Sequence, residues 1–140
     1  MNRKYYTKEG IIRHELLDKE AYEQANKFVR KIKGRDGKPA IDSKMSLTSA
    51  QLRRFFNEFR QLEKKVQVDG FEKVKPLIKM IKSRAAYAAN PGNRKIPESF
   101  KEFLVVNVDS IEQEKDFEAF MLYFEAVVGF FYGIPGVSNN

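Results

Sequence analysis

Apolar residues recur every three or four positions along most of the chain, and no segment alternates convincingly between apolar and polar residues. This spacing is typical of amphipathic helices and argues against strands. The sequence therefore predicts an all-α fold, a compact bundle of about five helices. The expected helices span residues 10–33, 48–65, 76–89, 97–111 and 116–132.

The second of these helices has the clearest start signal. Thr48 is a good N-cap, and Gln51 three residues later completes a capping box. Leu47 before the cap and Leu52 after it are spaced for a hydrophobic staple. The apolar stripe that follows consists of Leu52, Phe55, Phe56, Phe59, Leu62 and Val66.

The third helix has less regular signals. Asp69 followed by Glu72 offers a second capping signature. Pro76 has no N–H to donate and is best accommodated in the first turn of a helix. We therefore expect a bend near Val74 and Lys75, and a main helix that begins at Pro76.

Residues 34–47 interrupt the helical pattern with Gly34, Gly37 and Pro39 among small and charged residues. This composition is typical of a loop or linker, so we expect the N-terminal helix to be loosely attached. The predicted organisation is an N-terminal helix and linker over residues 1–47 and a helical bundle core over 48–140, together forming one domain.

The last helix carries apolar residues on most of its sides, since Leu122, Tyr123, Ala126 and Phe130 lie outside its main stripe. Such a helix is either central in its bundle or covered by another subunit. Self-association, as a dimer or as stacked copies, is therefore expected. The main stripe is Phe117, Phe120, Met121, Phe124, Val127, Val128 and Phe131.

The net charge of +7 is unevenly distributed. Residues 1–95 hold 24 Lys and Arg against 11 Asp and Glu, whereas residues 96–140 hold 2 against 8. A basic body joined to an acidic end points to a polyanionic partner, or else to an uneven solvated surface. Acidic residues are scarce in 48–95, with 4 against 12 basic ones, so basic faces of the second and third helices could form a continuous track for phosphates.

Catalytic or metal-binding residues are not expected. There is no Cys, and His14 is the single histidine, so a zinc site is not predicted. Glu112, Glu114, Asp116 and Glu118 surround a helix start, where acidic residues complement the helix dipole. Residues 34–38 do not match a phosphate-binding loop, and we expect neither an enzyme nor a cofactor.

No signal peptide and no apolar run of bilayer length is present, which favours a cytoplasmic protein without membrane contact.

Three short motifs stand out along the chain. They are Leu47-Thr48-Ser49-Ala50-Gln51-Leu52-Arg53-Arg54-Phe55-Phe56, Arg84-Ala85-Ala86-Tyr87-Ala88-Ala89, and Glu114-Lys115-Asp116-Phe117-Glu118-Ala119-Phe120 followed by Phe124-Glu125-Ala126-Val127-Val128. In this order they resemble the small subunit of the type III-A CRISPR effector, the Csm complex. The likeness covers about residues 45–133. It implies a non-catalytic helical bundle, stacked along a ribonucleoprotein filament, with guide RNA, target RNA and the other Csm subunits as partners.

The resemblance carries over Arg53, Arg84 and Arg94 as candidate RNA contacts. The family usually follows its Ala-Tyr-Ala-Ala segment closely with Gly-Arg, whereas here Asn90-Pro91-Gly92-Asn93 precedes Arg94. Together with the basic faces, the predicted nucleic-acid-binding set is Arg53, Arg54, Arg60, Lys64, Lys75, Lys79, Lys82, Arg84, Arg94 and Lys95.

Two other functions fit parts of the pattern. The second and third helices could form a DNA-binding helix-turn-helix, although the connection around 67–74 is longer than its usual tight turn. The chain could also be a protein–protein adaptor whose surface charge is incidental. Salt-dependent RNA binding, sequence-specific duplex DNA binding, or neither would distinguish the three.

Overall fold

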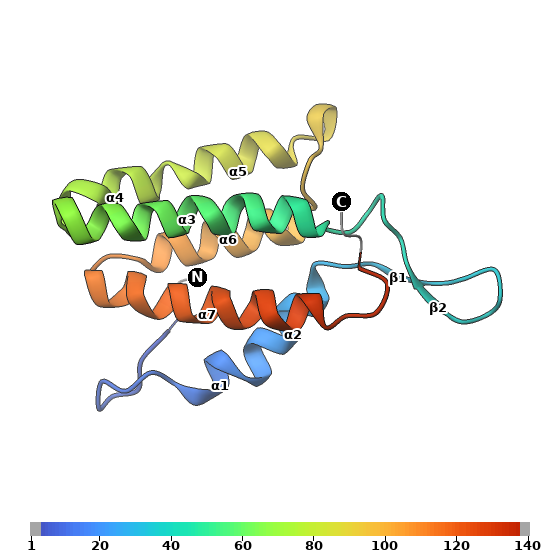
Figure 1. Ribbon diagram of the computed structural model, residues 1–140, viewed down its shortest axis with the longest axis horizontal. Helices are drawn as coiled ribbons and strands as arrows, with labels where there is room; N and C mark the ends of the chain where they lie inside the picture. The colour runs from blue at the N-terminus through green and yellow to red at the C-terminus, as the bar shows by residue number, and fades with distance from the viewer. Residues whose placement is uncertain (1–3, 138–140) are drawn as a thin grey trace.

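The computed structural model describes residues 4–137, apart from the side chain of Asn93, and is a mostly helical bundle with one small hairpin (Figure 1). This confirms the predicted fold class. In Figure 1, α3 lies between the α4–α5 pair and α7, with α6 behind them and α2 beside α7. The elements are α1 (His14–Leu17), α2 (Lys19–Lys27), β1 (Lys31–Lys33), β2 (Pro39–Ile41), α3 (Ser49–Asp69), α4 (Phe71–Lys79), α5 (Ile81–Ala89), the 3-10 turn η1 (Pro91–Asn93), α6 (Glu98–Ser110) and α7 (Glu114–Tyr132).

The start of α3 is the predicted capping box. The Thr48 hydroxyl accepts a hydrogen bond from the Gln51 backbone N–H at 3.2 Å, and the Gln51 side-chain oxygen accepts from the Thr48 N–H at 3.0 Å. Leu47 and Leu52 on either side of the cap are buried. Two of the otherwise unpaired backbone donors near this helix start are thereby satisfied.

We expect Thr48→Ala to lower the free energy of unfolding by about 1 kcal/mol, because the Gln51 N–H loses its acceptor. Urea unfolding followed by circular dichroism measures this loss. Gln67→Ala, an exposed change in the same helix, is the control and should alter stability by less than about 0.5 kcal/mol. Equal losses in the two variants would contradict a stabilising role for the cap.

The turn after α3 differs from the prediction. Gly70 alone separates α3 from α4 with a φ of +89°, and α4 starts without a side-chain cap, so the expected Asp69–Glu72 capping signature is wrong. Pro76 lies beyond the first turn of α4, where its missing N–H removes one helix hydrogen bond. The helix divides at Met80, one turn after the proline, rather than bending at Val74 and Lys75.

The predicted helix over 10–33 ends early, at Lys27, and the expectation of no strands is wrong. β1 and β2 form an antiparallel hairpin in which Lys31 pairs with Ile41 and Lys33 with Pro39. Asp36 closes the turn, because its Oδ1 accepts from the Lys38 N–H at 2.9 Å. Strands of three residues are too short for a period of two to register in the sequence.

The N-terminal segment is firmly packed rather than loosely attached. Leu16, Ala21, Ala25 and Phe28 are fully or almost fully buried, and α2 packs along α7. The Tyr5 hydroxyl donates to the buried Asn107 Oδ1 of α6 at 2.9 Å. This segment therefore belongs to the same hydrophobic core as the later helices.

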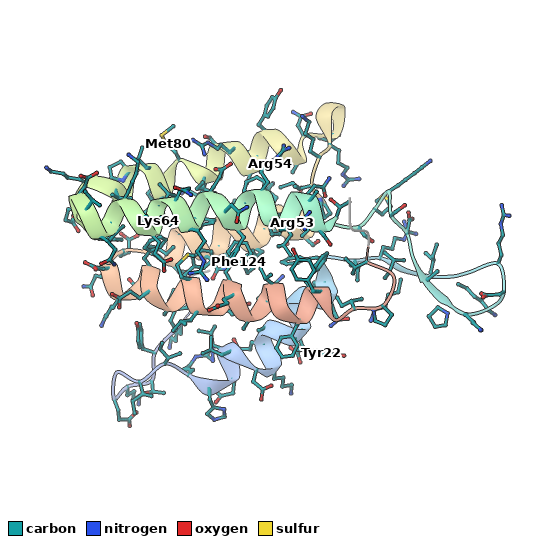
Figure 2. All side chains as sticks on the ribbon, viewed as in Figure 1. Tyr22, Arg53, Arg54, Lys64, Met80 and Phe124 are labelled. Carbon is teal, nitrogen blue, oxygen red and sulfur yellow. The ribbon has the colours of Figure 1, made fainter. Side chains whose placement is uncertain are left out.

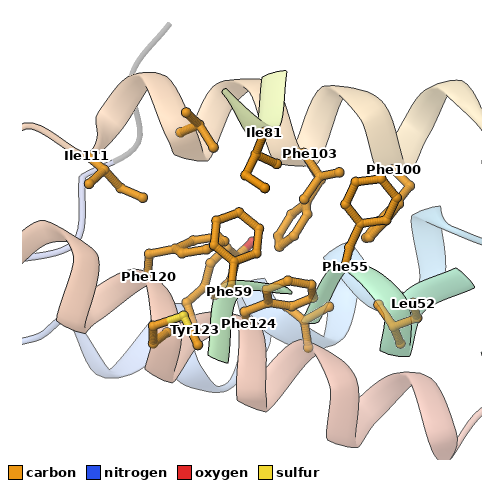
Figure 3. Close-up of a cluster of buried hydrophobic side chains, with 14 of the residues drawn as sticks. Leu52, Phe55, Phe59, Ile81, Phe100, Phe103, Ile111, Phe120, Tyr123 and Phe124 are labelled. Atoms are coloured by element: carbon orange, nitrogen blue, oxygen red, sulfur yellow. The ribbon is translucent and has the colours of Figure 1, made fainter. Parts of the chain in front are cut away.

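Aromatic rings from several helices fill that core (Figure 3). Helix α7 contacts α1 and α2 on one side and α3 on another. Of the four apolar residues outside the predicted stripe, Tyr123 is fully buried, whereas Leu122 is exposed and Ala126 and Phe130 are half-buried. The bundle therefore covers most of this helix but leaves part of its apolar surface open. Within residues 4–137 no helix has the length and apolar character needed to cross a membrane.

Candidate nucleic-acid interface

The outward face of α3 carries exposed cations without acidic partners. Arg53, Arg54 and Lys64 are exposed along this helix (Figure 2). Within the described part of the chain none of the three forms an ion pair. A shallow depression lies on the same face, lined by Ala50, Arg53, Arg54, Asn57, Glu58 and Gln61. This face can receive an anionic ligand without first breaking an internal contact.

Ion pairs border this face on both sides. The Arg60 guanidinium lies 2.9 Å from Glu63 of its own helix and 3.5 Å from Glu125 of α7. Across the other edge, Arg84 of α5 pairs with Glu58. Two of the predicted site residues, Arg60 and Arg84, therefore join α3 to its neighbours.

Lys75, Lys79 and Lys82 are directed to the end of α6. The Lys75 ammonium lies 3.1 Å from Glu112, and Lys82 lies 2.5 Å from Asp109. Lys79 donates to the Val108 carbonyl at 2.8 Å, which suits a cation at a helix C-terminus. The expected continuous track across two helices is thus divided into an unpaired row on α3 and an internally paired row on α4 and α5.

These lysines also change the acid strength of their partner. A hydrogen bond from Lys75, reinforced by the charge of Lys79, lowers the pKa of the Glu112 carboxyl below its ordinary value. The carboxylate therefore stays charged, and paired with Lys75 and Lys79, to a lower pH than an ordinary Glu would.

Arg94 and Lys95 lie at the end of the bundle where α3 begins. The Asn90–Asn93 insertion folds back, since the Lys95 N–H donates to the Ala88 carbonyl at 2.7 Å. The Arg94 guanidinium lies 3.8 Å from the Met45 sulfur. Both residues line a small depression together with Lys44, a cation that the sequence reasoning left in the linker.

Asp116, in the first turn of α7, has a structural role. Asp116 Oδ2 accepts from the N–H groups of Glu112 and Gln113 at 3.1 and 2.9 Å, which completes a capping box at Gln113. His14 is exposed and pairs with Glu15. No group of three or more His, Cys, Asp or Glu side chains in the described residues is placed to hold a metal ion.

The helical pair α3 and α4 does not have helix-turn-helix geometry. A single residue, Gly70, joins the two helices, and they run side by side in opposite directions (Figure 1). Helices of that DNA-binding motif cross at about 90–120° instead. The structure therefore gives the DNA-binding alternative no support.

Comparison with protein families gives a match to the Csm2 type III-A family over residues 15–133. The match includes the N-terminal helices and the hairpin, beyond the 45–133 segment in which the resemblance was recognised. Comparison with curated proteins and with solved structures found no match. The chain therefore belongs to the Csm2 family, the small subunits of the type III-A CRISPR effector (Csm) complex.

Proposed function

We propose that this small subunit is non-catalytic and holds the guide and target RNA by their backbones, without sequence preference. The observation that carries the proposal is the α3 face, where Arg53, Arg54 and Lys64 are exposed without carboxylate partners in the described residues. A subunit that must serve every guide gains nothing from base-specific contacts, so phosphate and ribose are the suitable targets.

The ten predicted residues are ranked by their internal contacts. Cations without an internal carboxylate, which are Arg53, Arg54, Lys64, Arg94 and Lys95, come first, because RNA does not compete with a protein partner there. Arg precedes Lys, since a guanidinium can bind one phosphate with two donors. Paired cations come second, because each must give up its ion pair or share it: Arg60, Lys75, Lys79, Lys82 and Arg84.

Stacking of copies has a candidate surface on the outer side of α4 and α5. Leu77, Met80 and Tyr87 are exposed by 39%, 51% and 69%, and their spacing places them on one helical face. Tyr87 is thus a surface residue rather than part of the bundle interior. The acidic residues of 96–140 cannot form the whole contact between stacked copies. Two of them, Asp109 and Glu112, already pair with lysines of their own chain.

Binding of the full-length protein to several unrelated RNAs of equal length tests the proposal. We expect equal affinities at one salt concentration, and log K should fall linearly with log salt by about 0.7–0.9 per phosphate contact. The RNA should be recovered intact after incubation with Mg²⁺ or Mn²⁺. Affinities that depend strongly on sequence would contradict backbone recognition. Cleavage that disappears in a Glu114→Gln/Asp116→Asn variant would contradict the non-catalytic role.

A further inference from the structure

An apolar groove lies at the opposite side of α7 from α3, where α2, the hairpin and the end of α7 meet. Its volume is ≈ 510 Å³. Tyr22 of α2 is 54% exposed and contacts Phe130 of α7 edge to face, with ring centroids 5.5 Å apart. Further apolar lining comes from Pro39, Ala40, Ile41, Ile134 and Pro135. The groove thus offers an aromatic wall that the bundle does not cover.

The hairpin beside this groove is strongly basic. It projects from the end of the bundle (Figure 1). Its single acidic residue, Asp36, is engaged in the turn through its bond to Lys38 N–H. Every cation of residues 30–41 is exposed, and none forms an ion pair within residues 4–137. These cations are Arg30, Lys31, Lys33, Arg35 and Lys38.

The strand register joins the basic and apolar features. Lys31 is opposite Ile41 and Lys33 is opposite Pro39, and cross-strand partners lie on the same face of a hairpin. Lys31, Pro39 and Ile41 all line the groove, so this basic face continues directly into its apolar wall. Lys31 is held there by a hydrogen bond from its ammonium to Asn26 Oδ1 at 2.9 Å.

We propose that the groove and hairpin form a second RNA site, which takes an unpaired nucleotide. The base packs against Tyr22 and Phe130, and the flanking phosphates contact Lys33, Arg35 and Lys38. Unpaired bases are commonly stacked on aromatic side chains while basic residues follow the backbone. An uncharged apolar peptide would leave the five cations without a counterpart, and a base stacked within a duplex has no free face to present. The inference rests on the proposed RNA-contacting function but concerns a separate surface.

Fluorescence of a single-stranded RNA that contains 2-aminopurine, titrated with the full-length protein, tests the site. Tyr22→Leu keeps an apolar contact to Phe130 but removes the more exposed of the two rings. It should strongly reduce the 2-aminopurine quenching and weaken binding about 5- to 150-fold. Lys33→Gln/Arg35→Gln/Lys38→Gln should lower the slope of log K against log salt by about 2, or about 0.7 for each phosphate contact. Circular dichroism should be unchanged in both variants.

A control with the same loss of charge is Lys8→Gln/Lys19→Gln/Lys73→Gln, which changes exposed lysines outside the groove and hairpin. It should bind with the wild-type slope. A comparison on α3 is Arg53→Gln/Arg54→Gln/Lys64→Gln. If only the α3 variant loses affinity, the groove proposal is overturned and the proposed function stands. If wild type does not bind, or no variant differs from it, both are overturned. Tighter binding of polyglutamate than of RNA would assign the groove to an acidic protein segment and overturn the RNA site.

Discussion

Replacing Phe124 by Ala is expected to lower the free energy of unfolding by about 3–5 kcal/mol. The Phe124 ring lies at the centre of the aromatic cluster, with centroids 5.0 Å from Phe56, 5.2 Å from Phe103 and 5.5 Å from Phe120. These neighbours come from α3, α6 and α7, so no single helix can move inward to fill the cavity. Removal of the ring also ends edge-to-face contacts worth about 0.5–1.5 kcal/mol each beyond their buried area.

Chemical unfolding measures this loss, and thermal unfolding should show a decrease in Tm of about 10–17 °C. Leu122→Ala is the matched control: it lies two residues away in the same helix, is 43% exposed, and should change stability much less. Since the total stability of a domain is about 5–15 kcal/mol, the loss in the Phe124 variant should remove a large share of it. Similar losses in the two variants would mean that the α7 orientation is wrong.

Long helices with a regular apolar stripe were predicted well from the sequence. The cap at Thr48 and the stripe from Leu52 to Val66 define α3, and the predicted α6 and α7 agree with the observed helices within one or two residues at each end. Capping and periodicity depend on residues within one or two turns, so the local sequence contains the information that they need.

Features that depend on distant contacts were missed. The glycine-containing segment 34–47 resembles a mobile linker, which led us to expect a loosely attached N-terminal helix. In the structure the residues before it are held by distant contacts. Tyr5 hydrogen-bonds Asn107, about a hundred positions along the chain, and α2 packs against α7. The hairpin was missed for a related reason: its pairing is between strands too short to show a pattern of their own.

The candidate interface also divides into features that the local sequence predicts and features that depend on distant contacts. Helical spacing placed Arg53 and Lys64 on one outward strip of α3, and both are exposed. It also placed Lys75 and Lys82 away from the core, but it could not show that Asp109 of α6 and Glu112, just after α6, lie beside them. Sequence spacing identifies the face of a helix, whereas the tertiary fold determines whether a cation on that face already has a partner.

This distinction leads to the expected result for the α3 variant Arg53→Gln/Arg54→Gln/Lys64→Gln in RNA binding. Gln retains helix propensity and most of the side-chain length but removes the charge. Because each phosphate contact contributes about 0.7–0.9 to the slope of log K against log salt, loss of three contacts should lower that slope by about 2 to 3. The reduction should be the same for unrelated RNA sequences, since phosphates carry no sequence information.

The informative comparison is Lys75→Gln/Lys79→Gln/Lys82→Gln, which removes the same charge from the internally paired row. This variant leaves Asp109 and Glu112 without their partners, so its main effect should be a modest loss of stability rather than a lower salt slope. Binding should be measured with the isolated subunit and again with its partner subunits, at matched ionic strength. If the paired row lowers the slope as much as the α3 row, ion pairing within the chain does not decide which cations bind RNA. If neither triple variant lowers the slope of log K against log salt, the cations of the α3 face contact only solvent. The adaptor function would then replace RNA binding at that face.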